Sequence, residues 1–130
     1  MPRVGALKRR PEFLRVAAGR VKWVTPGLVL QARCRGDAEE EIRVGFTVSR
    51  KVGNAVRRNR ARRRLRAAAG EVLPALGRPG YDYVVIGRAA TPERPFRDLV
   101  GDLRHAVEAL ARRGGCGRKA QPRRAAEPRT

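Results

Sequence analysis

The sequence predicts an α+β fold, a single mixed sheet with packed helices in the order α-β-β-α-β-α. Two kinds of segment support this prediction. Three segments alternate apolar and polar residues or are largely apolar, which is the pattern of β-strands, and two long segments repeat apolar residues every three or four positions, as amphipathic helices do. These segments interleave along 130 residues, a length typical of one domain with one hydrophobic core.

The first element is a short helix, expected at residues 11–19. Pro11 suits the first turn of a helix, because that turn does not need its N–H group. Glu12 complements the positive end of the helix dipole, and Gly19 suits the position where the helix ends.

Three strands are expected. Residues 28–35 and 42–50 each alternate apolar and polar side chains, so one face of each strand should be buried. The polar residues 36–41 between them are expected to form a hairpin connection. Residues 81–88, YDYVVIGR, are apolar enough to predict a central strand of the sheet.

Two longer helices are expected at residues 54–73 and 95–112. Each segment carries one apolar stripe that would face the core, and its remaining positions are polar or charged. In the first helix the stripe consists of Ala61, Leu65, Ala68, Ala69 and Val72. In the second helix it consists of Phe96, Leu99, Val100, Leu103, Val107 and Leu110.

Composition divides the chain into three parts. Residues 11–112 contain all the expected helices and strands and form the folded domain. Residues 1–10 are predicted to be a basic N-terminal extension. Residues 113–130 are rich in Gly, Pro and Arg and show no apolar periodicity, so a disordered basic tail is expected there.

The charge of the chain indicates a polyanionic partner. Lys and Arg number 31 and Asp and Glu number 12, which gives a net charge of +19. Self-repulsion at this level destabilises a compact monomer, and nucleic acid is the first candidate to relieve it. No apolar run approaches the ~18 residues of a membrane-spanning helix, so we expect no membrane partner and a cytoplasmic protein. The two cysteines are too few for a zinc ribbon.

The basic residues concentrate on the helix expected at residues 54–73. Seven of the ten residues from Arg57 to Arg66 are arginine, and no acidic residue occurs between Arg43 and Gly70. Like charges three and four positions apart repel one another on a helix, so this density is not explained by helix stability. A solvated basic face is the simpler interpretation, but a partner's phosphates would relieve the repulsion. Gly53 would permit a tight turn before the helix, and Asn54 is a good N-cap.

The same stretch resembles the bacterial ribonuclease P protein component. The family's signature has an Arg-Asn-Arg core that follows Gly-Asn-Ala-Val, and its spacing is intact here. It reads Lys51-Val52-Gly53-Asn54-Ala55-Val56-Arg57-Arg58-Asn59-Arg60 and continues with Arg62, Arg63, Leu65 and Arg66. The N-terminal pattern around Phe13, the YDYVVIGR strand and the last helix are also similar, so the resemblance covers residues 7 to about 110.

This resemblance implies a function. The family's protein binds a large catalytic RNA that, with Mg²⁺, removes the 5′ leader of precursor tRNA. The expected partners are therefore ribonuclease P RNA and precursor tRNA, with no protein partner required, and Mg²⁺ would be bound mainly by the RNA subunit and the substrate. The resemblance also implies a ribonuclease P protein-like fold with a left-handed βαβ crossover. The expected RNA-binding residues are Arg50, Lys51, Asn54, Arg57, Arg58, Asn59, Arg60, Arg62, Arg63 and Arg66.

In this family a cleft between the sheet and the first helix holds the leader as a single strand. Phe13 matches an aromatic residue of that cleft, and Gln31 stands where the family has an aromatic residue on the first long strand. A second family aromatic is replaced by Ala17. Phe13 is open to two interpretations, a leader-stacking residue or a packing contact between helix and sheet.

No constellation of side chains suggests that the protein performs the chemistry itself. The sequence has no evident catalytic triad or carboxylate cluster, and its one histidine, His105, is expected to face solvent beside Asp102. We therefore predict no catalytic residue and no metal site. The alternatives are a ribosomal or other structural RNA-binding protein and a DNA-compacting protein, which would share the size and the charge.

Overall fold

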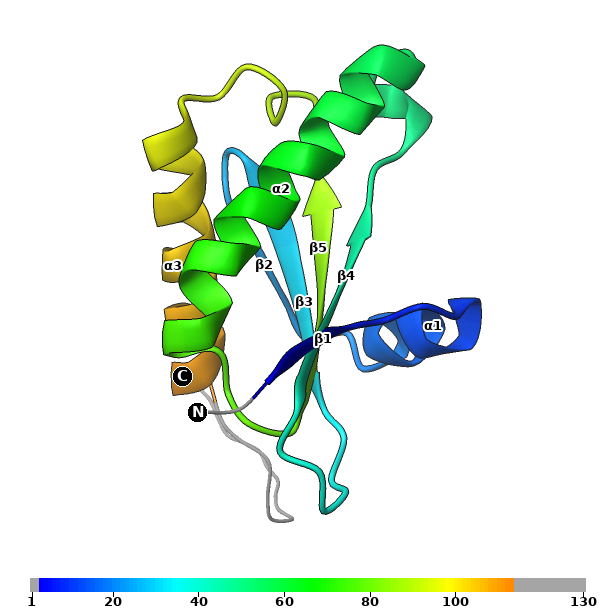
Figure 1. Cartoon of the computed structure of the whole chain (residues 1–130), viewed down its shortest axis with the longest axis vertical. Helices are drawn as coiled ribbons and strands as arrows, with labels where there is room; N and C mark the ends of the chain where they lie inside the picture. Colours follow the sequence, from blue (N-terminus) through cyan, green and yellow to red (C-terminus); the bar gives the residue numbers. More distant parts are fainter. Residues whose placement is uncertain (1–2, 114–130) are drawn as a thin grey trace.

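The computed structural model describes residues 3–113, which form an α+β domain with one five-stranded mixed sheet, as the sequence predicted (Figure 1). Its elements are β1 (Val4–Ala6), α1 (Arg10–Ala18), β2 (Lys22–Val24), β3 (Leu28–Cys34), β4 (Ile42–Thr47), the 3₁₀ turn η1 (Arg50–Val52), α2 (Ala55–Leu76), β5 (Tyr81–Gly87) and α3 (Phe96–Arg112). The tail expected from residue 113 lies outside the described residues, apart from Arg113, which caps α3.

Two short strands correct the predicted element order. β1 lies within the segment that was expected to be an N-terminal extension, and it pairs in parallel with β4. The pairing is continued by hydrogen bonds from the Ile42 N–H to the Arg3 carbonyl and from the Leu7 N–H to the Val44 carbonyl. β2 pairs antiparallel with β3. A strand of three residues is too short for the repeated alternation of apolar and polar side chains by which a strand is predicted from sequence.

The sheet has the strand order β1-β4-β5-β3-β2. β4 pairs in parallel with both β1 and β5, whereas β3 is antiparallel to β5. The hairpin predicted at residues 36–41 is therefore wrong, because β5 lies between β3 and β4 and pairs with both of them. In Figure 1, β4 and β5 both run upward, α2 passes in front of them, and β5 lies to the left of β4. The β4–α2–β5 unit is therefore left-handed, as the resemblance implied, although about 98% of such crossovers are right-handed.

Helices cover the two faces of the sheet unequally. α2 and α3 pack on one face, where the main core gathers apolar side chains such as Leu30, Val85 and Leu103. α1 lies on the opposite face (Figure 1) over a small second core of Leu7, Val16 and Val84. Because α1 is the only described helix on that face, part of the face stays open beside it.

Within residues 3–113, no helix is both long enough and apolar enough to cross a lipid bilayer.

Candidate nucleic-acid interface

A capped turn fixes where the basic helix begins. The Ser49 hydroxyl accepts a hydrogen bond from the Lys51 N–H at 3.3 Å, and the Asn54 side chain accepts one from the Arg57 N–H at 3.0 Å. Gly53 has φ of 143°, a conformation that residues with a Cβ rarely adopt. A Cβ at this position would also come within 2.7 Å of the Arg57 side chain. The predicted glycine turn and asparagine N-cap are therefore confirmed.

Three arginines of α2 bind the connection between β5 and α3, and we call Arg57, Arg60 and Arg64 the loop arginines. Arg57 pairs with both Glu93 oxygens, at 2.5 and 2.9 Å. Arg60 donates to the Pro92 carbonyl at 2.7 Å, and Arg64 donates to the carbonyls of Thr91 and Arg94. These guanidinium groups therefore hold the 88–95 connection against the helix.

Glu93 is an acidic neighbour that the local sequence does not reveal, because it follows Arg57 by 36 residues. Its hydrogen bond to Arg57 raises the pKa of that guanidinium, and the same contact lowers the pKa of the Glu93 carboxyl. Arg57 and Arg60 were predicted to bind RNA, and the structure gives both of them intramolecular partners. A phosphate would have to compete with Glu93 for Arg57.

Four other arginines of the helix, Arg58, Arg62, Arg63 and Arg66, are here called the open arginines. Within residues 3–113, none of them pairs with a carboxylate or donates to a backbone carbonyl. Arg62 donates to the Asn59 side chain at 3.2 Å, and the Arg66 guanidinium carbon lies 5.5 Å from the centre of the Phe46 ring. Arg50 and Lys51 in η1 are exposed beside the start of the helix. These cations of η1 and α2 are therefore available to a polyanion.

A buried ion cluster beneath α1 was not found from the sequence. The Asp82 side chain is 2% exposed and accepts hydrogen bonds from Arg35 at 2.8 Å and from Arg43 at 2.9 Å. The bond to Asp82 raises the pKa of Arg43. Arg43 also bonds Glu12 of α1 at 3.2 Å. The cluster therefore links β4, β5 and the end of β3 to the helix that forms one wall of the predicted cleft.

Glu12 also closes the start of α1. It accepts hydrogen bonds from the N–H groups of Arg9 and Lys8, and these two bonds lower the pKa of its carboxyl from the usual 4.5. A carboxyl with a lowered pKa in the folded state stabilises the fold above its usual pKa, and that contribution is lost as the pH falls through the lowered value. The contacts that the Glu12 carboxylate makes at the start of α1 should therefore weaken at acidic pH, and α1 should dock less firmly on the sheet.

Phe13 and Gln31 lie on the same face of the sheet, two strands apart. The Phe13 ring lies so close to Gly45 that a Cβ there would collide with it. Val84 separates the two positions, because it pairs with Gly45 on one side and with Gln31 on the other. Gln31 is therefore about 10 Å from the strand under Phe13, which is two strand spacings.

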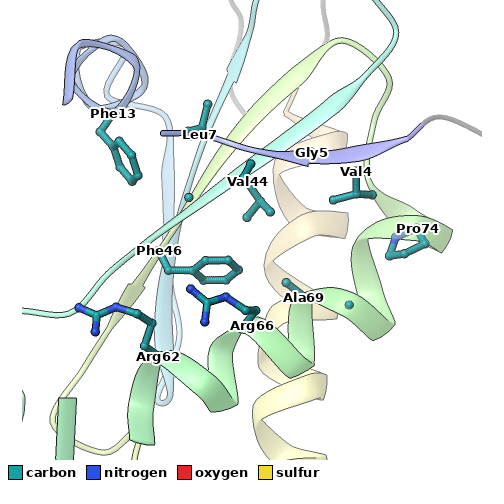
Figure 2. A pocket seen from close by; sticks show the side chains of 13 residues that line it. Val4, Gly5, Leu7, Phe13, Val44, Phe46, Arg62, Arg66, Ala69 and Pro74 are labelled. Carbon is teal, nitrogen blue, oxygen red and sulfur yellow. The ribbon is translucent and has the colours of Figure 1, made fainter. Parts of the chain in front are cut away.

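One pocket opens at the edge of the sheet between β1, β4 and α2, and we call it the edge pocket (Figure 2). Its volume is about 520 Å³. Figure 2 shows Phe46 in its centre, Arg62 and Arg66 on its α2 side, and Phe13 at its far rim. The lining residues are Val4, Gly5, Ala6, Leu7, Phe13, Val44, Gly45, Phe46, Arg62, Arg66, Ala69, Gly70 and Pro74.

Within residues 3–113, no group of three or more His, Cys, Asp or Glu side chains could hold a metal ion. His105 is exposed, and its ring packs edge to face with the Trp23 ring, the two ring centroids lying 5.7 Å apart. Asp102 pairs with Arg94, and this contact raises the pKa of Arg94.

The arrangement matches that of known proteins. The sequence model of the Ribonuclease P family matches residues 1–111. The ribonuclease P protein component of Paramagnetospirillum magneticum is 55% identical over 111 residues, which cover 83% of this chain and 84% of the relative. That of Ruegeria pomeroyi is 53% identical over 109 residues, covering 82% and 86%.

Solved structures agree with the sequence relatives. The RNase P protein from Thermotoga maritima is similar with a TM-score of 0.67 at 25% identity, covering 85% of this chain and 98% of that chain. A Staphylococcus aureus RNase P protein shares the fold with a TM-score of 0.67 at 22% identity, covering 80% and 93%. The family match spans most of the chain and the two relatives share more than half of their aligned residues with it, so the chain belongs to the family of bacterial ribonuclease P protein components.

Proposed function

We propose that this ribonuclease P subunit binds the catalytic RNA through the open arginines of α2, together with Arg50 and Lys51. The observation that carries the proposal is the division of the α2 arginines into two sets. The loop arginines already have partners within the fold, whereas Arg58, Arg62, Arg63 and Arg66 have no anionic partner within the described part of the chain. Their mutual repulsion is relieved when phosphates bind between them.

Copurification tests this role directly. The full chain, tagged and isolated from its native cells, is expected to retain one large RNA species. That complex should remove the 5′ leader from precursor tRNA when Mg²⁺ is supplied. Recovery of ribosomal RNA or of DNA in place of this species would contradict the proposal and favour a structural nucleic-acid-binding role.

The chemical step is proposed to belong to the RNA. Because the described side chains offer no cluster that could hold a metal ion, RNA and substrate phosphates are the proposed ligands of Mg²⁺. The protein would contribute positive charge, which strengthens binding of the catalytic RNA and of precursor tRNA. It would also contribute the surface of α1 and the sheet, along which the leader can lie. No side chain of this chain is assigned a proton transfer.

Removing candidate acid–base groups should therefore leave cleavage intact. His105→Ala and Glu71→Gln are each expected to leave the single-turnover rate of the assembled holoenzyme near that of the wild type. Loss of a true general acid or base would slow the step by ~10²–10⁴-fold. A reduction of that size, with RNA binding unchanged, would assign chemistry to the protein.

We propose further that α1 and the sheet hold the single-stranded leader, with Phe13 as the aromatic contact. Phe13→Ala is expected to weaken binding of precursor tRNA to the holoenzyme by ~1–3 kcal/mol, the contribution of one stacked base. Mature tRNA has no leader, so its affinity should stay unchanged. The measurement is the ratio of the two affinities at one fixed salt concentration.

Val16→Ala is the matched control for Phe13→Ala. Val16 is buried in the same small core as Phe13, but it has no aromatic ring to offer a base. Val16→Ala removes buried methyl groups and keeps the Phe13 ring, so at temperatures where α1 stays docked it should leave the ratio of precursor to mature tRNA affinity unchanged. Equal ratios for both variants and the wild type would show that Phe13 is only a packing residue.

A further inference from the structure

The edge pocket combines two kinds of surface that one nucleotide would need. Its floor and rim are apolar and include the rings of Phe46 and Phe13, and its α2 wall carries Arg62 and Arg66. None of its lining residues is acidic. We propose that the edge pocket receives one unpaired nucleotide of the RNA bound along α2, with its base against Phe46 and its phosphate at Arg62 and Arg66. This inference rests on the proposed function.

The pocket is open because β1 is shorter than its neighbour. β1 pairs with β4 only from Ile42 to Val44, whereas β4 continues to Thr47. Phe46 therefore lies beyond the end of the pairing, and its ring is only partly buried. Figure 2 shows this ring pointing into the space between the strands and α2. An aromatic ring left partly open in this way offers a stacking surface to a base.

The cations are placed to hold a phosphate next to that ring. Arg66 lies against Phe46, with its guanidinium carbon 5.5 Å from the ring centre. Arg62 is one helical turn earlier, and its only hydrogen bond within the described residues goes to the neutral side chain of Asn59. Two guanidinium groups without an anionic partner can each donate two parallel hydrogen bonds to a phosphate.

The wall of α2 supplies an acceptor as well. Pro74 lies inside the helix and has no N–H, so it cannot donate the usual bond to the carbonyl of Gly70, four residues earlier. Both residues line the pocket. The Gly70 carbonyl can accept instead from a ring N–H or an exocyclic amine of a base.

These features favour a nucleotide over an acidic protein segment. A carboxylate side chain would satisfy the arginines but would leave the aromatic floor and the Gly70 carbonyl without matching groups. A nucleotide brings an anion, a flat apolar ring and an N–H donor in one unit. The pocket also adjoins the open arginines, so RNA bound to them passes its entrance.

Filling the pocket is the sharpest test. A Cβ on Gly70 would meet no atom within 4 Å, and the same is true of Gly101 on α3, away from the pocket. Gly70→Leu and Gly101→Leu are therefore matched substitutions, and both favour the helix because leucine is a better helix former than glycine. Equal thermal unfolding midpoints would show that both variants fold.

In the holoenzyme, Gly70→Leu is expected to weaken binding of ribonuclease P RNA roughly five- to hundred-fold, the effect of losing one stacked base. Gly101→Leu should bind as the wild type does. If the wild-type chain binds this RNA and both variants bind it equally well, the pocket holds no nucleotide. If the wild-type chain itself does not bind the RNA, the proposed function is wrong. The experiment therefore distinguishes failure of the pocket proposal from failure of the proposed function.

Binding of small probes to the full chain identifies the ligand chemistry. In an NMR titration, adenosine monophosphate should shift the amide signals of Val44, Phe46 and Ala69, and Gly70→Leu and Phe46→Leu should each weaken this response. Adenosine alone and inorganic phosphate alone should give smaller shifts. Equal responses to phosphate and to the nucleotide would reduce the pocket to an anion site, and displacement of the nucleotide by a hexaglutamate peptide would indicate a protein partner. Either result would overturn the inference.

Discussion

Replacing Arg58, Arg62 and Arg63 together with glutamine is expected to weaken binding of ribonuclease P RNA on the order of 100-fold at about 150 mM salt. Each guanidinium that neutralises a phosphate releases counterions, so affinity and its salt dependence fall together. The slope of log K against log salt should become shallower by roughly two to three, because each lost contact removes about 0.7–0.9 from it. Measuring the affinity across a series of salt concentrations gives both quantities.

The loop arginines provide a control with the same change in charge. Replacing Arg57, Arg60 and Arg64 with glutamine also removes three positive charges from α2, but these side chains hold the 88–95 connection. This variant is expected to lower the thermal unfolding midpoint, while the salt slope changes by less than about one unit. If the two triple variants change the slope equally, the division of the α2 arginines into two sets is wrong.

The sequence alone was sufficient to predict the helices and strands whose own residues show a periodic apolar pattern. The alternation in β3 and β4 and the apolar stripes of α2 and α3 predicted these elements within a few residues, because burial of one face decides both the pattern and the structure. α2 runs from Ala55 to Leu76, past the predicted end at residue 73. Pro74 lies in its last turn and does not end it.

The short strands and the partners of the arginines could not be predicted in this way. β1 exists through its pairing with β4, and Glu93 reaches Arg57 only because the crossover returns the chain to the start of α2. The buried cluster did leave one signal in the sequence. Asp82 stands within a strand of otherwise mostly apolar residues, and a carboxylate buried in the middle of a sheet requires cationic partners. Arg35, directly after the end of β3, and Arg43 in β4 supply them.

Asp82→Ala is expected to lower the free energy of unfolding by about 3 kcal/mol, the lower end of the range for removing one partner of a buried ion pair. The substitution removes an acceptor that Arg35, whose side chain is 5% exposed, shares with Arg43, while Asp37 still pairs with Arg35 and Glu12 with Arg43. Urea denaturation of the free protein measures the loss. Glu71→Ala is the control, because it breaks the exposed Glu71–Arg97 pair, which should contribute less than about 1 kcal/mol.

Comparing Asp82→Ala with Asp82→Asn distinguishes the effect of the cluster on stability from its effect on the position of α1. Asp82→Asn keeps the size of the side chain but not its charge, so it should lose less stability than Asp82→Ala while still weakening the hold on Arg43. Because Arg43 also bonds Glu12, α1 should dock less firmly in both variants. The holoenzyme should then lose preference for precursor over mature tRNA at temperatures where the protein is still folded. Unchanged preference together with the full loss of stability would show that the cluster supports the sheet alone and that other contacts place α1.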